Sequence, residues 1–290
     1  MNVNMTDNTN SSKVYTLYYA FFLIPLMITL IGVMFFFVFK VLTYETASPY
    51  DYLTDIQIGS ATKRWQAAFE LSKLLSDFDR IPDDEGFQNK MIALYNKSIY
   101  DDPKVRTYMA MAMGRTGQVK YGSSLLEGLK DDNSITRLAA IKALGLLKYG
   151  DAVKHLQEFL AEKYSSEERL AAVIALGNMN DNSVIPNLKT LLDDEEPNIR
   201  WDASIALMKL GDSSGIYVIE NLLDRSYFDK FSEIDSEEEV GAILVAIQIT
   251  SQYPSEKFVK NLMKLATLDR NMQIRDLAIK TLDKVYNKNI

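Results

Sequence analysis

The sequence predicts an all-α fold, in which a right-handed α-solenoid of about seven helix pairs follows one transmembrane helix. Three observations predict it. A long uncharged apolar stretch lies near the N-terminus, a motif of about 31 residues recurs in the remainder, and the motif places its apolar residues on one helical face. The predicted regions are a polar tail at 1–13, a transmembrane helix at 14–42 and the solenoid at 43–290.

The N-terminal stretch is long enough to cross a bilayer as a helix. No residue from Val14 to Phe39 is charged. At about 1.5 Å per residue, a helix of this length exceeds the ~30 Å hydrocarbon layer. The alternative is a cleaved signal peptide, whose apolar region is usually about 7 to 15 residues long and precedes small residues. Because Lys40 to Tyr44 is a poor cleavage site, we expect an uncleaved anchor.

Few charges flank this anchor. Asp7 and Lys13 precede it, and Lys40, Lys63 and Arg64 follow it. Positive charge favours the cytoplasmic side, so we expect a cytoplasmic solenoid. The many Lys, Asn and Ile residues and the lack of cysteine are typical of a protein from an AT-rich bacterial genome. Together with the anchor, this predicts a single-pass protein of a bacterial inner membrane. Aromatic residues expected at the headgroup level are Tyr15, Tyr18, Tyr19 and Tyr44.

The composition excludes several classes of function. With 39 acids, 32 bases and a net charge of −7, the chain would repel the phosphates of a nucleic acid. It has no cysteine, which removes thiolate nucleophiles, disulfides and Cys-ligated metals. Its one histidine, His155, lies in a helical stretch, and we interpret it as a helix-surface residue. No phosphate-binding loop or hydrolase motif occurs. We therefore expect no enzyme activity, no metal and no cofactor.

A motif of the form Arg-x-x-Ala-x-x-Ala-Leu-Gly recurs through the centre of the chain. Its clearest copies begin 31, 32 and 31 residues apart, at Arg106, Arg137, Arg169 and Arg200. Looser copies begin at Arg64 and Arg275, and a copy with glutamate at the arginine place begins at Glu239. Seven units therefore fit.

Each copy has the spacing of an amphipathic helix. Small and apolar residues recur at i, i+3, i+4 and i+7, which makes one helical face. Another amphipathic stretch precedes each copy, for instance 184–192, and polar breaks such as 193–198 and 211–214 separate the stretches. Asp and Ser can cap the helix that follows, and Gly can end the one before. A single pair of such helices cannot bury its own apolar face, so the units must stack.

The copies resemble the HEAT repeat, in particular the short HEAT-like type of the phycobilin lyases. The resemblance covers about residues 50–286 and is strongest from Asp102 to Leu210. In that family the matching arginine and a turn aspartate form a ladder between repeats. The resemblance therefore implies stacking roles at the arginine places Arg106, Arg137, Arg169 and Arg200 and at the aspartate places Asp151, Asp181 and Asp212. Glu239 departs from this pattern.

Two regions interrupt the regular spacing. Residues 78–101 lengthen the second unit, and residues 224–238 add a loop to the sixth. An insertion projects from a solenoid, and exposed aromatic residues beside acids can anchor a partner. Tyr227, Phe228 and Phe231 are therefore our candidates for partner contact. In the alternative, these residues fold back and cover the lengthened unit.

The predicted architecture favours protein binding over catalysis. We expect a membrane-anchored scaffold or accessory subunit of a membrane complex, which binds its partner on the concave surface or through the loop after Asp224. The stretch from Pro49 to Ala68 resembles bacterial membrane HEAT-repeat proteins that accompany ABC-type transporters, which implies such a transporter as partner. Two alternatives are a chromophore-lyase-like HEAT protein, suggested by the repeat type, and a purely structural tether.

Overall fold

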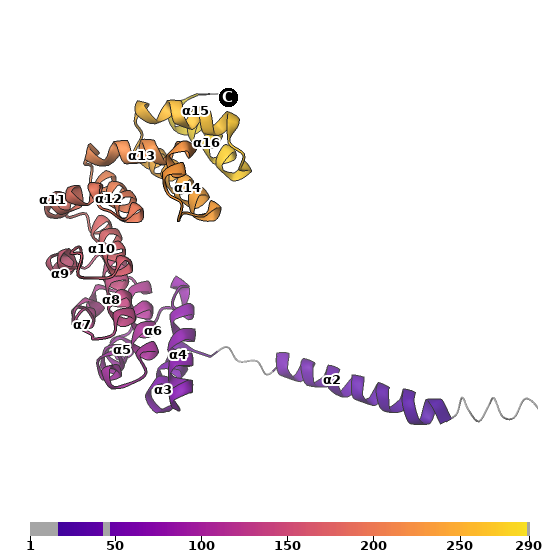
Figure 1. The fold of residues 1–290 in the computed structure, drawn as a ribbon. Coiled ribbons are helices and arrows are strands. Elements are labelled where there is room, and N and C mark those ends of the chain that lie inside the picture. Colours follow the sequence, from indigo (N-terminus) through magenta and orange to yellow (C-terminus); the bar gives the residue numbers. More distant parts are fainter. Residues whose placement is uncertain (1–16, 43–46, 289–290) are drawn as a thin grey trace, which may run out of the picture. The chain divides into compact units, whose positions relative to one another are not determined.

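The computed structural model describes residues 17–42 and 47–288. The predicted tail at 1–13, the first residues of the predicted anchor at 14–16, Tyr15 and Tyr44 lie outside the described residues. The chain divides into two compact units, 1–48 and 49–290. Within the described ranges it forms helices and no strand, as predicted (Figure 1).

The first unit contains one apolar helix. A turn of π-helix, η1 (Tyr19–Leu23), continues directly into α2 (Ile24–Leu42). Pro25 follows this π-helical turn directly, and because it has no backbone N–H it cannot donate the hydrogen bond that a regular helix would have there. The 22 residues Tyr19–Lys40 are long and apolar enough to cross a membrane. Their large apolar side chains, such as Phe35 at 69% exposure, find no core to pack against among the described residues.

The second unit is a stack of seven helix pairs, which confirms the predicted number. Each pair is an outer helix followed by an inner helix (Figure 1). The outer helices are α3 (Pro49–Ile58), α5 (Glu85–Lys97), α7 (Gly122–Gly128), α9 (Val153–Glu158), α11 (Ile185–Thr190), α13 (Ile216–Leu222) and α15 (Val259–Leu268). The inner helices are α4 (Ala61–Leu74), α6 (Pro103–Arg115), α8 (Ser134–Leu147), α10 (Ser166–Asn178), α12 (Pro197–Lys209), α14 (Ser236–Gln252) and α16 (Met272–Tyr286).

Short 3₁₀ turns connect these helices. Five of them lead into the outer helices α7, α9, α11, α13 and α15: η4 (Val119–Tyr121), η5 (Gly150–Ala152), η6 (Asn182–Val184), η8 (Ser213–Gly215) and η10 (Glu256–Phe258). The others are η2 (Phe78–Arg80), η3 (Ser98–Tyr100), η7 (Leu191–Asp193) and η9 (Arg225–Lys230). The region 78–101 supplies α5, whose 13 residues exceed the six of α9 and of α11. This region therefore lengthens the outer helix of the second unit.

Local sequence fixes where the inner helices begin. Asn133 caps α8, because its side chain accepts hydrogen bonds from two amides of the first turn (3.0 and 3.2 Å). Ser165 and Glu168 form a capping box at the start of α10. Asp235 caps α14, whose first turn is rich in glutamate that also favours the helix dipole. Asn133 lies in one of the polar breaks of the sequence, 131–134, and Asp235 lies in the inserted loop 224–238.

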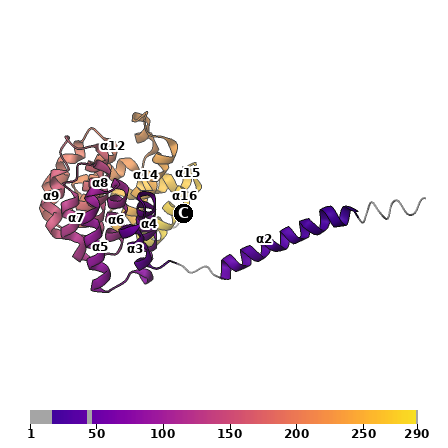
Figure 2. The ribbon, with the colours of Figure 1, turned by 90° about the horizontal axis from the view of Figure 1, so that it is seen from below.

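The inner helices pack directly against one another and line the inside of the curve (Figure 2). Contact is extensive from α4 through α6, α8 and α10 to α12, and again between α14 and α16. Among the described residues, α12 and α14 touch very little. The stack is therefore interrupted once, between the fifth and sixth pairs.

The last residue of the Ala-Leu-Gly motif allows this close packing. A Cβ atom added to Gly114 would lie 2.7 Å from Cα of Ala143 in the next inner helix. The same atom on Gly145 would lie 2.8 Å from Cα of Ala175, and a Cβ on Gly177 would be similarly blocked by Ala206. The alanine at one motif place thus fills the space that the glycine of the preceding unit leaves open. The sequence pattern alone indicated no role of its own for this glycine, and the structure shows that it lies inside the helix at the contact with the next unit.

Candidate functional site

The motif arginines join each unit to the next. Arg106 is almost fully buried, at 4% exposure. Its guanidinium lies over the ring of Tyr95 at 4.4 Å and donates a hydrogen bond to the Tyr95 carbonyl at 3.0 Å. On its other side, Nε lies 3.0 Å from a carboxylate oxygen of Asp131, which belongs to the turn inside the following unit. One side chain therefore holds both its own unit and its neighbour.

Two further arginines repeat this arrangement. Arg137 pairs with Glu168 of the next inner helix at 2.7 Å and donates to two carbonyls of its own turn at 2.8 and 3.0 Å. Arg169 pairs with Asp194 and donates to the Leu160 carbonyl at 3.2 Å. These pairs are half-buried or buried, so loss of one partner would leave an uncompensated charge in a poorly solvated place.

The predicted aspartate partners were wrong. Asp151, Asp181 and Asp212 follow the C-terminal ends of inner helices, whereas the arginines lie in the first turns. An inner helix of 13 residues spans about 20 Å, so the two sets lie at opposite ends of the inner helices. The pairs between units join the arginines to Asp131, Glu168 and Asp194. Asp181 instead caps a 3₁₀ turn through the Ser183 amide at 2.8 Å.

Asp212 does link two units, but through lysine. Its carboxylate lies 2.8 Å from Nζ of Lys189 in the preceding outer helix and accepts from the Ser214 amide at 2.8 Å. These hydrogen bonds, chiefly the one from Lys189, lower the pKa of Asp212 to about 2. Asp151 contacts His155 through its backbone carbonyl at 3.3 Å. His155 is exposed on α9, as the sequence suggested.

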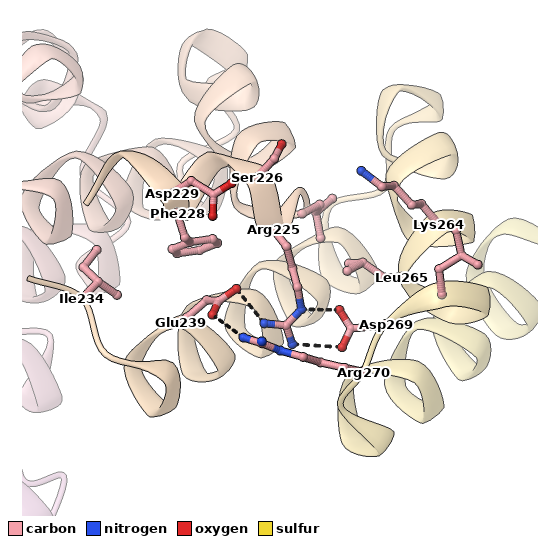
Figure 3. A pocket seen from close by; sticks show the side chains of 12 residues that line it. Arg225, Ser226, Phe228, Asp229, Ile234, Glu239, Lys264, Leu265, Asp269 and Arg270 are labelled. Atoms are coloured by element: carbon pink, nitrogen blue, oxygen red, sulfur yellow. Dashed lines mark hydrogen bonds and ion pairs between the residues drawn. The ribbon is translucent and has the colours of Figure 1, made fainter. Parts of the chain in front are cut away.

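At the sixth unit, the acid and the base of the ion pair between units exchange places. Glu239 occupies the arginine place, and Arg225 of the preceding turn pairs with it at 2.6 Å. Arg225 also binds Asp269 of the last unit in a bidentate fashion at 2.7 and 2.9 Å (Figure 3). Arg270 adds a contact to Glu239 at 3.1 Å. Arg225 therefore supplies the guanidinium that the helix lacks.

Asp269 is the buried member of its ion pair with Arg225. Its side chain is 1% exposed. Burial by itself would raise the pKa of Asp269, but hydrogen bonds from Arg225 and from the Asn271 amide outweigh it and hold the pKa below its usual range. The hydrogen bond to Asp269 and, to a smaller extent, the one to Glu239 raise the pKa of Arg225. Both groups are therefore charged at neutral pH.

A cavity of about 560 Å³ lies beside this network (Figure 3). Apolar side chains of Leu223, Phe228 and Leu265 form part of its wall. Four of its charged groups, Arg225, Glu239, Asp269 and Arg270, are joined by ion pairs. Lys264 at its edge pairs with Asp224 at 3.0 Å. Within the described part of the chain, no group of three or more His, Asp or Glu side chains is placed to hold a metal ion. The wall therefore combines charged and apolar side chains.

The aromatic residues of the inserted loop pack inward. Phe228 is 6% exposed and lies edge-on to Trp201 at 5.6 Å. Phe231 contacts the same indole at 6.2 Å and lies under the Arg200 guanidinium at 5.6 Å. Tyr227 accepts a hydrogen bond from the indole N–H at 3.3 Å. This is the arrangement of the fold-back alternative, in which the loop fills the gap between α12 and α14; partner contact by these residues stays a prediction.

The inner face presents apolar groups that the sequence analysis did not single out. Leu146 and Ile174 are 58% and 42% exposed on neighbouring inner helices. They border a second cavity of about 280 Å³, together with Lys142 and Asn178. Lys209 of α12 continues this line, because its ammonium donates to the Asn178 amide oxygen at 3.0 Å. We call these residues and Arg115 of α6 the inner strip.

The inner strip has a regular sequence signature. Its members follow the motif arginines by five or nine residues, in the C-terminal halves of the inner helices. Comparison of the residues five and nine places after each motif arginine would have singled it out in the sequence. Asp202 lies nearby on α12; burial raises its pKa to about 6, although Lys209 opposes the shift.

Comparison with known proteins agrees with this architecture. The family model for HEAT repeats matches residues 97–168 and 158–230. The search of curated proteins finds no match. Among solved structures, the chain is similar to the complex of CpcE and CpcF of phycocyanin lyase from Nostoc sp. PCC7120, with a TM-score of 0.54 and 19% identity over 83% of this chain and 94% of that one.

Two engineered proteins are more distant. Both have a TM-score of 0.46, at 15% and 17% identity, and they cover 84% and 82% of this chain and 98% and 68% of their own chains. At these identities the solved structures show the fold alone. The family match, the repeat spacing and the inner-helix packing support one assignment: residues 97–230 are HEAT repeats within a solenoid of stacked helix pairs.

Proposed function

We propose that this protein is a membrane-anchored scaffold that binds another protein along the inner face of its solenoid. The exposed apolar groups of the inner strip carry the proposal. Leu146 and Ile174 border a cavity on helices that are otherwise closely packed. A largely apolar cavity on a concave surface is typical of a binding site.

The apolar helix at the N-terminus supports the membrane part of the proposal. Residues 19–40 are long and apolar enough to span a bilayer. Only residues 43–48 separate the end of α2 from the start of α3, so a partner in the same membrane would meet the solenoid at a high effective concentration. A subunit of a membrane complex, such as an ABC-type transporter, is the partner we propose, with the solenoid in the cytoplasm.

The proposed binding can be tested by affinity purification from gently solubilised membranes. Three forms are compared: the full chain, a chain lacking residues 1–45, and the double variant Leu146→Glu with Ile174→Glu. We expect one protein to co-purify with the full chain and to be lost with the double variant. Val119→Glu changes an equally exposed apolar residue (57%) away from the inner face and serves as matched control. Equal recovery with all solenoid variants would contradict the proposal.

A chromophore-lyase-like role is the second candidate, because the chain shares its fold with the phycocyanin lyase complex and has a cavity of about 560 Å³. It predicts that the purified full chain binds a linear tetrapyrrole with a shift in its visible absorption. Absence of such a shift at saturating pigment would remove this candidate.

A further inference from the structure

The central inner helices differ in charge from the rest of the protein. The chain carries a net charge of −7, yet α6 and α8 contain no aspartate or glutamate. The acids of α10 lie only in its first turn, where Glu168 already pairs with Arg137. Lys142 is exposed and has no acidic partner among the described residues. An acidic protein therefore presents a locally basic inner surface.

Basic and apolar groups lie together in the inner strip. Lys142 borders the 280 Å³ cavity with Leu146 and Ile174, and Lys209 reaches the same cavity through Asn178. The ammonium groups thus flank an apolar opening. A ligand that matches this surface has apolar side chains with acids beside them. Acids would pair with Lys142, and apolar side chains would cover Leu146 and Ile174.

The spacing of the inner helices indicates the form of the ligand. Packed helices lie about 8–10 Å apart, and seven residues of an α-helix rise about 10.5 Å. A helix that runs along the stack can therefore present one apolar side chain to each inner helix with a repeat of seven residues. Acids on both flanks of that apolar stripe would then meet Lys142 and, two inner helices further, Lys209.

We propose that the inner strip binds an acidic amphipathic helix of the partner protein. This inference rests on the proposed function and adds the chemical class of the partner segment. The chain's own polar tail does not match this class, because residues 1–13 contain one acid, Asp7, and one base, Lys13. Asp202 on α12 limits the basic surface toward the C-terminal units.

The test uses the full chain in a lipid nanodisc and a labelled synthetic helix of about 21 residues, with leucine every three or four residues and glutamate on both flanks. Binding is followed by fluorescence anisotropy. Two control peptides carry lysine in place of glutamate, or a central proline that prevents helix formation. We expect the acidic helix to bind most tightly and both controls to bind at least tenfold more weakly, about the effect of losing several such contacts.

Charge reversal locates the site. Lys142→Glu is expected to weaken binding of the acidic helix about fivefold and to strengthen binding of the basic helix. Lys154→Glu makes the same change on the exposed side of outer helix α9 and should leave both affinities unchanged. Equal binding of acidic and basic helices, binding to neither, or an equal effect of the two variants would overturn the inference.

Failure of this inference is distinguishable from failure of the proposed function. Suppose that recovery of the co-purified protein depends on Leu146 and Ile174, but the charge of the peptide does not change its affinity. The scaffold function then stands, and the proposal of an acidic helix is wrong. If light scattering shows that the chain associates with itself and that Lys142→Glu abolishes this, the occupant is a second copy, and the inference also falls.

Discussion

Gly145→Ala tests the packing of the inner helices, because helix propensity and close packing predict changes of opposite sign in the free energy of unfolding. In the interior of an ordinary helix, replacing glycine by alanine stabilises a protein by about 0.5–1 kcal/mol, because alanine loses less backbone entropy. At Gly145, however, the new Cβ would lie 2.7 Å from Cβ and 2.8 Å from Cα of Ala175. The second of these is a backbone atom and cannot rotate away.

The magnitude follows from these two effects. Overpacking a close contact costs typically about 1–3 kcal/mol. With the gain in helix propensity subtracted, we expect Gly145→Ala to lower the free energy of unfolding by about 1–2 kcal/mol. Gly241→Ala is the matched control, since Gly241 lies inside α14 with nothing within 4 Å of its added Cβ. It should raise the free energy of unfolding by about 0.5–1 kcal/mol.

Urea titration followed by far-ultraviolet circular dichroism measures both variants. A further variant combines Gly145→Ala with Ala175→Gly, which removes the opposing Cβ and should recover part of the loss. If Gly145→Ala stabilises the protein as much as Gly241→Ala does, the proposed role of the motif glycine is refuted.

Three further predictions address charge and the anchor. Arg225→Met leaves the buried Asp269 without its partner, so the free energy of unfolding should fall by about 3 kcal/mol in urea titration, and adding Asp269→Asn should restore most of it. Asp202 has a raised pKa of about 6 in the folded chain, so the folded state loses stability relative to the unfolded state as pH rises from about 4 through 6. Asp202→Asn should therefore raise the melting temperature at pH 8 and leave it nearly unchanged at pH 4; an equal increase at both would contradict the buried carboxylate. Deletion of residues 1–45 should move the protein from the membrane pellet to the supernatant after cell fractionation, and continued sedimentation with the membrane would show that the solenoid itself binds the bilayer.

The repeat architecture was predictable because each unit repeats the same packing problem. A helix that packs on two neighbours needs small residues at fixed places, and Ala140, Ala172 and Ala203 occupy equivalent places in the motif. All three are buried in the structure. The arginine place was recognisable for the same reason, since a buried guanidinium recurs with the period of the stack.

The acids that pair with these arginines were not predictable from the pattern. They lie in the turn inside a unit, where Asp131 and Asp194 have equivalent places but the fourth unit uses Glu168 of the helix itself. Arg225 is a similar case, because it compensates for Glu239 only through the path of the inserted loop. The sequence shows the charge but not which chain segment brings it close.

Two features of the surface depend on tertiary contacts. The aromatic loop residues look exposed in sequence, yet Phe228 fills the gap beside Trp201. Leu146 and Ile174 look like core residues by their spacing, yet they open onto the inner face. Phe228 is buried because α12 and α14 touch very little and the loop fills the space between them. Leu146 and Ile174 are exposed although α8 and α10 pack closely, because they face away from that contact.

Site-specific photocrosslinking in intact membranes tests the central claim most directly. A photoreactive residue is placed at Ile174 on the inner face or, as matched control, at His155 on the exposed face of α9. The scaffold proposal predicts that the inner position crosslinks to one membrane-associated protein, that Leu146→Glu abolishes this product, and that the outer position gives none. Crosslinks of equal yield from both positions, or none from Ile174, would contradict it.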